Sequence, residues 1–192
     1  MGCGVNSDID HVSILVKSVD TTALNLKANG FIIGDKETFK DVGTEEIYIG
    51  SYEKTALLLL QGVIGDGPYK KALIKRGYGL HHIAICTDDF EEYNEKLSNL
   101  GWYIHPNSMK KYYHNKAMFY IKPGVKTIIE LLIKNELMDG ERFIEEVIVN
   151  VDKRLENCIN GLGIKGLKCS TDKESYFIIN NTKIAISEIV QM

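Results

Sequence analysis

Several features that would assign the chain to a specialised class of protein are missing from its 192 residues. The four cysteines are widely scattered without a C-x-x-C pair, which argues against a disulfide framework or a thiolate zinc site. The longest apolar run, ALLLL at 56–60, is far too short to span a bilayer, and the N-terminus lacks the apolar stretch of a signal peptide. A net charge of −3 gives no general attraction to nucleic acid or to an anionic membrane. We therefore expect a cytoplasmic protein with a small-molecule substrate, and neither nucleic acid nor membrane as a partner.

An internal repeat is the first positive feature of the chain. Residues 9–20 (IDHVSILVKSVD) and 80–91 (LHHIAICTDDFE) are similar strand-like runs, and His11 of the first aligns with His82 of the second. Phosphate-loop and dinucleotide fingerprints are absent, so the repeat is the strongest sequence signal of function.

A predicted helix follows each of the two strands. Ser18 is placed to cap the first helix and Asp89 the second, and Gly30 and Gly101 stand where these helices should end. Three extended segments come after each helix, so both copies read β-α-β-β-β. The sequence predicts an α+β fold, in which tandem βαβββ modules form a curved, barrel-like mixed sheet with the helices outside.

A third and weaker copy occupies residues 143–192, where Glu146 takes the position of His11 and about Ala185 that of the carboxylate described below. An isolated module exposes an open concave face and needs a partner. We expect this half-module either to cap the two-module body or to form a homodimer through 143–192. The predicted division is 1–135, with modules at about 9–63 and 79–133, followed by 136–192.

His11 and His82 share a strand face with small or polar residues, because successive side chains in a strand point to opposite faces. Glu130 interrupts an apolar run in the last extended segment of the second copy, and burying an unpaired carboxylate is costly. One shared divalent cation is the simplest explanation for all three residues. Structural hydrogen bonds for the histidines and a lysine partner for Glu130 are the alternatives. His81 falls on the helix-packing face and is the poorer ligand candidate.

The histidine-led strands and their helices resemble the vicinal oxygen chelate superfamily, which includes glyoxalase I, methylmalonyl-CoA epimerase and the extradiol ring-cleaving dioxygenases. Within it, residues 67–89 (GPYKKALIKRGYGLHHIAICTDD) look most like methylmalonyl-CoA epimerase and its glyoxalase-like relatives. The resemblance covers about residues 9–133.

The resemblance implies metal ligands on the first and last strands of each module, here His11, His82 and Glu130. The matching position in the first module falls at about Leu58, which cannot ligate, and Gln61 would need a register slip to reach it. Three protein ligands would leave the remaining coordination positions to water or substrate.

The activity implied is that of a lyase or isomerase of the glyoxalase I (lactoylglutathione lyase) or methylmalonyl-CoA epimerase type. A divalent metal ion (Zn, Co, Ni, Mn or Fe) would stabilise the enolate of a small carbonyl or thioester substrate. Glu130 is a candidate base on one side of the substrate, with Glu45 or Glu46 on the other. His114 is a candidate acid-base group in the second module. The plainer alternative is that Glu45, Glu46 and His114 are exposed and have no catalytic role.

Two other functions remain open. Two histidines and one carboxylate are also the ligand set of Fe(II) oxygenases, which keeps a ring-cleaving dioxygenase possible. A non-catalytic protein could use the same cleft to sequester a small molecule. The basic run at 70–76 could hold a phosphate tail such as that of CoA, or could be a solvated helix face.

Overall fold

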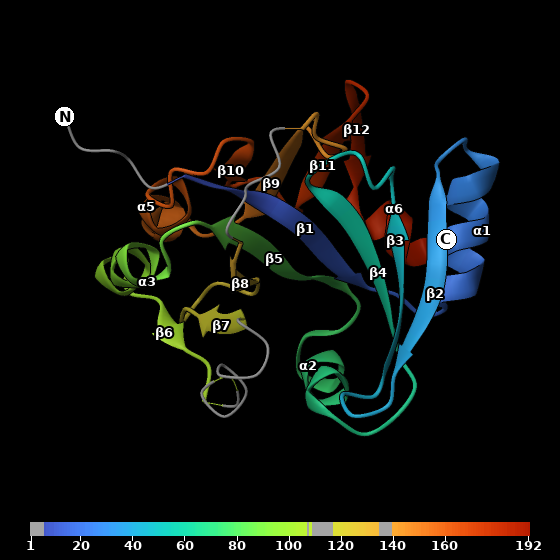
Figure 1. The fold of residues 1–192 in the computed structure, drawn as a ribbon, viewed down its shortest axis with the longest axis horizontal. Helices are drawn as coiled ribbons and strands as arrows, with labels where there is room; N and C mark the ends of the chain where they lie inside the picture. The colour runs from blue at the N-terminus through green and yellow to red at the C-terminus, as the bar shows by residue number, and fades with distance from the viewer. Residues whose placement is uncertain (1–5, 107, 109–116, 135–139) are drawn as a thin grey trace.

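One curved eight-stranded sheet forms the body of the molecule (Figure 1). The structure is a computed structural model that describes residues 6–106, 108, 117–134 and 140–192, so the predicted site residue His114 lies outside the described residues. The first module comprises β1 (Ser7–Leu15), α1 (Val19–Ala28), β2 (Ile33–Phe39), β3 (Thr44–Ile49) and β4 (Leu57–Val63). After helix α2 (Pro68–Arg76), the second comprises β5 (Gly79–Thr87), α3 (Phe90–Asn99), β6 (Tyr103–Ile104), β7 (Ala117–Ile121) and β8 (Ile128–Ile133).

The strand order of this sheet is β2-β3-β4-β1-β5-β8-β7-β6. In each module the first strand pairs in parallel with the last, β1 with β4 and β5 with β8, and the antiparallel pair β1–β5 joins the two modules. This arrangement confirms the predicted fold class. It also brings the two histidine-bearing strands side by side at the centre of the sheet.

The predicted caps begin both module helices. Ser18 Oγ accepts a hydrogen bond from the amide of Thr21 at 3.2 Å, and Asp89 Oδ1 accepts one from the amide of Glu92 at 3.0 Å. Gly101, just beyond α3, has a φ of 75°, a conformation that glycine adopts without the steric penalty of a Cβ atom. Local signals in the sequence therefore set where both helices begin and where α3 ends.

A second, four-stranded sheet is built from the C-terminal residues. Its elements are β9 (Glu146–Asn150), the 3-10 turn η1 (Lys153–Leu155), α5 (Glu156–Asn160), β10 (Leu167–Ser170), β11 (Tyr176–Ile179), β12 (Thr182–Ala185) and α6 (Ile186–Gln191). The strand order is β10-β9-β11-β12, so the first strand pairs with the second and third instead of the fourth. The unit therefore repeats the chain order of the modules but has a different sheet order. Its Glu146 forms an ion pair with Lys168.

The last strand, β12, ends at Ala185, and the chain continues as helix α6. Ile186 and Ile189 are buried on one side of α6, and their spacing of three residues is that of a helix face. The hairpin before it turns at Asn180 and Asn181, which have φ values of 50° and 59°.

The C-terminal unit covers the face of the large sheet opposite the histidines. Helix α6 packs on β1 and β5, and Figure 1 shows the orange and red strands behind them. Trp102 Nε1 donates to the carbonyl of Cys158 at 3.1 Å, and the Tyr93 hydroxyl donates to that of Leu162 at 3.2 Å. The C-terminal unit therefore caps the two-module body, which is one of the two arrangements expected from the sequence. The other, homodimer formation, stays a prediction. The boundary at residue 135 also stays a prediction. Within the described residues, each helix is too short or too polar to traverse a bilayer.

Candidate metal centre

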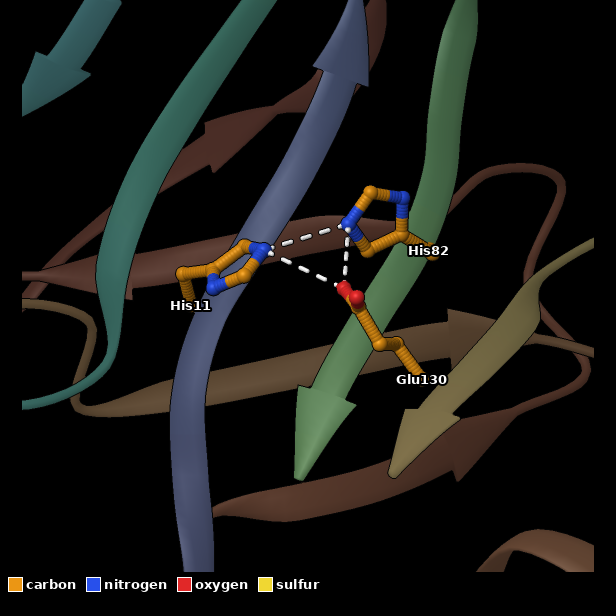
Figure 2. Close-up of side chains that lie close together, drawn as sticks. All are labelled: His11, His82 and Glu130. Atoms are coloured by element: carbon orange, nitrogen blue, oxygen red, sulfur yellow. Dashed lines mark hydrogen bonds and ion pairs between the residues drawn. The ribbon is translucent and has the colours of Figure 1, made fainter. Parts of the chain in front are cut away.

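Three side chains from three adjacent strands converge on the concave face of the sheet (Figure 2). His11 Nε2 on β1 lies 3.1 Å from His82 Nε2 on β5. Glu130 Oε2 on β8 lies 3.2 Å from His82 Nε2 and 3.6 Å from His11 Nε2. The strand register produces this meeting, because Ser13 lies opposite His82 on β5 and Ala84 lies beside Glu130 on β8. The three residues expected to share a cation are therefore brought together.

The spacing of these atoms fits one divalent ion. Nitrogen and carboxylate ligands bind such an ion at about 2.0–2.2 Å, which separates neighbouring ligand atoms by roughly 3.0–3.6 Å. The three observed separations span 3.1–3.6 Å. His11, His82 and Glu130 could thus hold a metal ion without a rearrangement of the backbone.

Asp10 orients the ring of His11. Its Oδ1 lies 2.7 Å from His11 Nδ1, and its other oxygen accepts from Lys134. Burial raises the pKa of Asp10, but the hydrogen bonds and charges of His11 and Lys134 outweigh this and lower it to about 2. An ionised carboxylate can only accept, so the proton of His11 resides on Nδ1 and the lone pair of Nε2 points into the cluster.

The protonation states of the other two residues also suit a metal. Burial lowers the pKa of His82, and the hydrogen bond and charge of Glu130 only partly oppose it. Burial raises the pKa of Glu130, yet the hydrogen bond to His82 and the attraction of both imidazoles bring it below its ordinary value. At neutral pH the centre thus presents neutral imidazole and an ionised carboxylate, which are the metal-binding forms.

The predicted matching position at Leu58 is wrong by one residue. Leu59 is the counterpart of Glu130, because Ser13 pairs with Leu59 as Ala84 pairs with Glu130. A shift of one residue reverses the face of a strand, and Leu58 indeed packs into the outer core. Gln61, two residues beyond Leu59, faces the concave side without any register slip.

Gln61 links Ser13, on the histidine strand β1, to Glu46. Its Oε1 accepts from the hydroxyl of Ser13, and its Nε2 donates to Glu46 Oε1 at 2.7 Å. Thr44 donates to the same Glu46 oxygen at 2.8 Å. Glu45 points to the opposite face, where it lies 3.6 Å from Lys36 Nζ. Of the two predicted glutamates, only Glu46 faces the centre.

Two tyrosines that the sequence analysis overlooked flank the centre. The Tyr48 ring lies edge-on to His11 with 5.7 Å between centroids. The Tyr69 ring on α2 lies 4.8 Å from the ring of His81, whose Nδ1 is 2.8 Å from His82 Nδ1. Burial raises the pKa of both phenols, so they remain protonated and can donate hydrogen bonds. Tyr48 lies two residues after Glu46 on the same strand, so strand alternation would have put it on the same face. The position of Tyr69 depends on where α2 packs, which the sequence does not indicate.

Comparison with known proteins gives structural likeness without sequence matches. No family model and no curated protein matches the chain. A methylmalonyl-CoA epimerase structure aligns at 22% identity with a TM-score of 0.55, over 70% of this chain and all of the other. The Mycobacterium tuberculosis methylmalonyl-CoA epimerase aligns at 21% identity with a TM-score of 0.51, over 66% of this chain and 87% of that one.

Related epimerase structures contain ligands. A Streptomyces coelicolor epimerase variant in complex with 2-nitronate-propionyl-CoA aligns at 22% identity with a TM-score of 0.52, over 67% of this chain and 98% of that one. Another epimerase was solved with methylmalonyl-CoA and ammonium. At these identities the likeness shows the fold, which is the vicinal oxygen chelate fold of the epimerases.

Replacing Asp10 by asparagine should weaken metal binding about 10- to 100-fold, since the carboxylate that orients His11 and increases its basicity is lost. Titration of the purified variant with Zn²⁺ against a chromophoric chelator measures this. Asp8→Asn is the matched control, because Asp8 lies on the same strand but binds Arg142 instead of a histidine. Equal zinc affinity in Asp10→Asn and wild type would show that the ring of His11 needs no carboxylate.

Proposed function

We propose that this protein is a metal-dependent isomerase or lyase of the vicinal oxygen chelate type, acting next to the carbonyl or thioester group of a small substrate. The observation that carries the proposal is the convergence of His11, His82 and Glu130 on the concave face. Glu46, which accepts a hydrogen bond from Gln61, adds a second carboxylate on the same face. Epimerases share this fold and supply the reaction class.

His11, His82 and Glu130 would hold the divalent metal, which would act as a Lewis acid for the oxygen that becomes negative in an enolate. Glu46 is placed to remove the proton of the neighbouring carbon, because both of its hydrogen bonds engage Oε1 and leave Oε2 to accept a proton. Glu130 would pass a proton taken from solvent to the opposite face of the carbon, and Glu46 would release its own proton to solvent. Removal from one face and return to the other inverts the carbon without net change in composition.

A thioester of CoA is the substrate we propose to test first. Epimerase structures of this fold contain such ligands. Helix α2 of this chain carries four cationic side chains, which could pair with the phosphates of CoA. They are Lys70, Lys71, Lys75 and Arg76.

Proton exchange with solvent tests the proposal. We expect metal-loaded protein in D2O to remove the signal of the exchangeable proton from the NMR spectrum of methylmalonyl-CoA or of the hemithioacetal of methylglyoxal and glutathione. The comparison is the same protein after EDTA treatment, which should lose the exchange. Binding of a substrate at one equivalent without exchange or product formation would contradict an enzyme and support a sequestering protein.

A ring-cleaving dioxygenase is the second candidate, and the ligand set of two histidines and one carboxylate favours it. Oxygen uptake by the Fe(II)-loaded protein with catechol would support this activity. The same experiment with Zn²⁺-loaded protein is the control, since zinc does not take part in redox chemistry.

A further inference from the structure

A cavity of about 250 Å³ lies beside the proposed metal centre, on the Asp10 side of His11. Tyr48 lines it and contacts the His11 ring edge-on, and Leu57 lines it and is paired with His11 across the strands. The volume equals roughly eight water molecules at about 30 Å³ each. The cavity and the centre are therefore neighbours across the side chains of His11 and Tyr48.

Glu141 and Phe143, which lead into the C-terminal unit, pair with Thr55 of the cavity wall. The amide of Thr55 donates to the carbonyl of Glu141 at 3.0 Å, and the amide of Phe143 donates back to Thr55 at 2.8 Å. Lys134, just after β8, lines the same cavity. The wall therefore combines the β3–β4 connection with the residues that lead into the C-terminal unit.

Thr55 provides the strongest sign that something binds here. Its side chain lines the cavity, and the residue is only 8% exposed. Among the buried side-chain oxygen and nitrogen atoms of the described residues, Thr55 Oγ1 is the one without a hydrogen-bond partner. A buried hydroxyl without a partner is unfavourable, and rotation of the Thr55 side chain would turn this hydroxyl towards a ligand atom in the cavity.

The carboxylates of the cavity wall are already occupied. Asp10 accepts from His11 through one oxygen and from Lys134 through the other. Asp8 accepts from Arg142 and from the amide of Ile9, both at Oδ1. Each acid is thus paired with a cationic side chain, which offsets its negative charge at the cavity wall.

The hydrogen-bond donors of the wall are in excess. Lys54 holds one partner, Glu141, at 3.1 Å, and that carboxylate is 80% exposed, so the pair is weak. Lys134 holds Asp10, and each ammonium group has three N–H donors. The hydroxyls of Thr55 and Tyr48 add two more donors.

We propose that this cavity binds a compact oxyanion, a carboxylate or phosphate, carried by the molecule that reacts at the metal centre. Lys54, Lys134, Thr55 and Tyr48 would donate to it. The second half of this statement rests on the proposed function and narrows the substrate to carbonyl or thioester compounds with an anionic group close to the reacting carbon. The first half, anion binding, stands independently of turnover.

The test is an NMR titration of ¹⁵N-labelled, EDTA-treated protein with inorganic phosphate and, separately, with acetate. We expect saturable chemical-shift changes of the backbone amides around Thr55. The anion with the lower Kd, phosphate or acetate, identifies the kind of oxyanion that the cavity prefers. Thr55→Val should raise the Kd of that anion about 10-fold or more, since a hydrogen bond to a charged group is lost. Its Tm should be unchanged or higher, because valine has the same shape without the unpartnered hydroxyl.

Lys54→Gln should also weaken binding, whereas Lys27→Gln on the exposed end of α1 removes the same charge elsewhere and should not. Equal affinity in Thr55→Val and wild type, an equal loss in Lys27→Gln and Lys54→Gln, or no saturable shifts with either anion would overturn the proposal. Saturable binding without proton exchange would refute only the proposed function. Proton exchange without anion binding would refute only the cavity proposal.

Discussion

His82→Ala is expected to lose stoichiometric divalent metal, with an affinity for the metal lower by at least about 100-fold. Removing a residue that only orients a ligand costs up to about 100-fold, and His82 is itself a proposed ligand. His82 contacts both other members of the cluster, at 3.1 Å and 3.2 Å. The side chain is buried, so water cannot easily replace the missing nitrogen at the same position. Metal analysis by mass spectrometry after dialysis measures the loss, and the metal found in wild type identifies the next assay.

His81→Ala is the matched comparison, because His81 lies outside the cluster and reaches it only through Nδ1 of the His82 ring. We expect a smaller loss of affinity, about 10- to 100-fold, because the three ligands remain. A near-stoichiometric metal content in His82→Ala would mean that the paired histidines are structural.

The affinity for metal should fall on acidification, because protons compete for the same atoms. Burial lowers the pKa of His82 and raises that of Glu130, but the hydrogen bond and attraction of the histidines bring the pKa of Glu130 below its ordinary value, so both groups are in their binding form at neutral pH. Affinity should hardly change between pH 8 and about 7 and should decrease as the pH falls through the lowered pKa of His82.

Glu46→Gln is expected to reduce proton exchange by about 10²- to 10⁴-fold, the usual contribution of a general base. Glutamine keeps an oxygen that can accept from Gln61 and Thr44, so the local hydrogen bonds survive while the proton acceptor is lost. The rate of deuterium incorporation into the substrate identified above measures the effect on kcat, and metal content should remain as in wild type.

Glu45→Gln provides the control at the adjacent position. Glu45 points away from the centre towards Lys36, so its replacement should leave the exchange rate within a few-fold of wild type. A comparable loss in both variants would indicate a general effect of charge or stability and would rule out Glu46 as the base.

Local patterns were enough to identify the modules and three members of the site. Ser18 and Asp89 marked the starts of the helices, and the alternation of small and large residues put His11 and His82 on one face. Glu130 stood out because a carboxylate in an apolar strand needs a partner. These signals depend on neighbouring residues, which the sequence contains directly.

The finer parts of the site depended on register and packing. Which side chains of β3 face the concave side decided between Glu45 and Glu46 as the candidate base. The register of β4 against β1 moved the first-module counterpart of Glu130 from Leu58 to Leu59. A one-residue error is invisible in an apolar run but reverses the side-chain face.

The sequence by itself determined that two βαβββ modules pair and that two histidines and a glutamate meet between them. Only the tertiary structure decided how the C-terminal unit orders its strands, which face it covers, and that Lys54, Thr55 and Lys134 surround one cavity. The reason is physical: strand and helix signals act over a few residues, whereas sheet order and cavities arise from contacts between segments far apart in the chain.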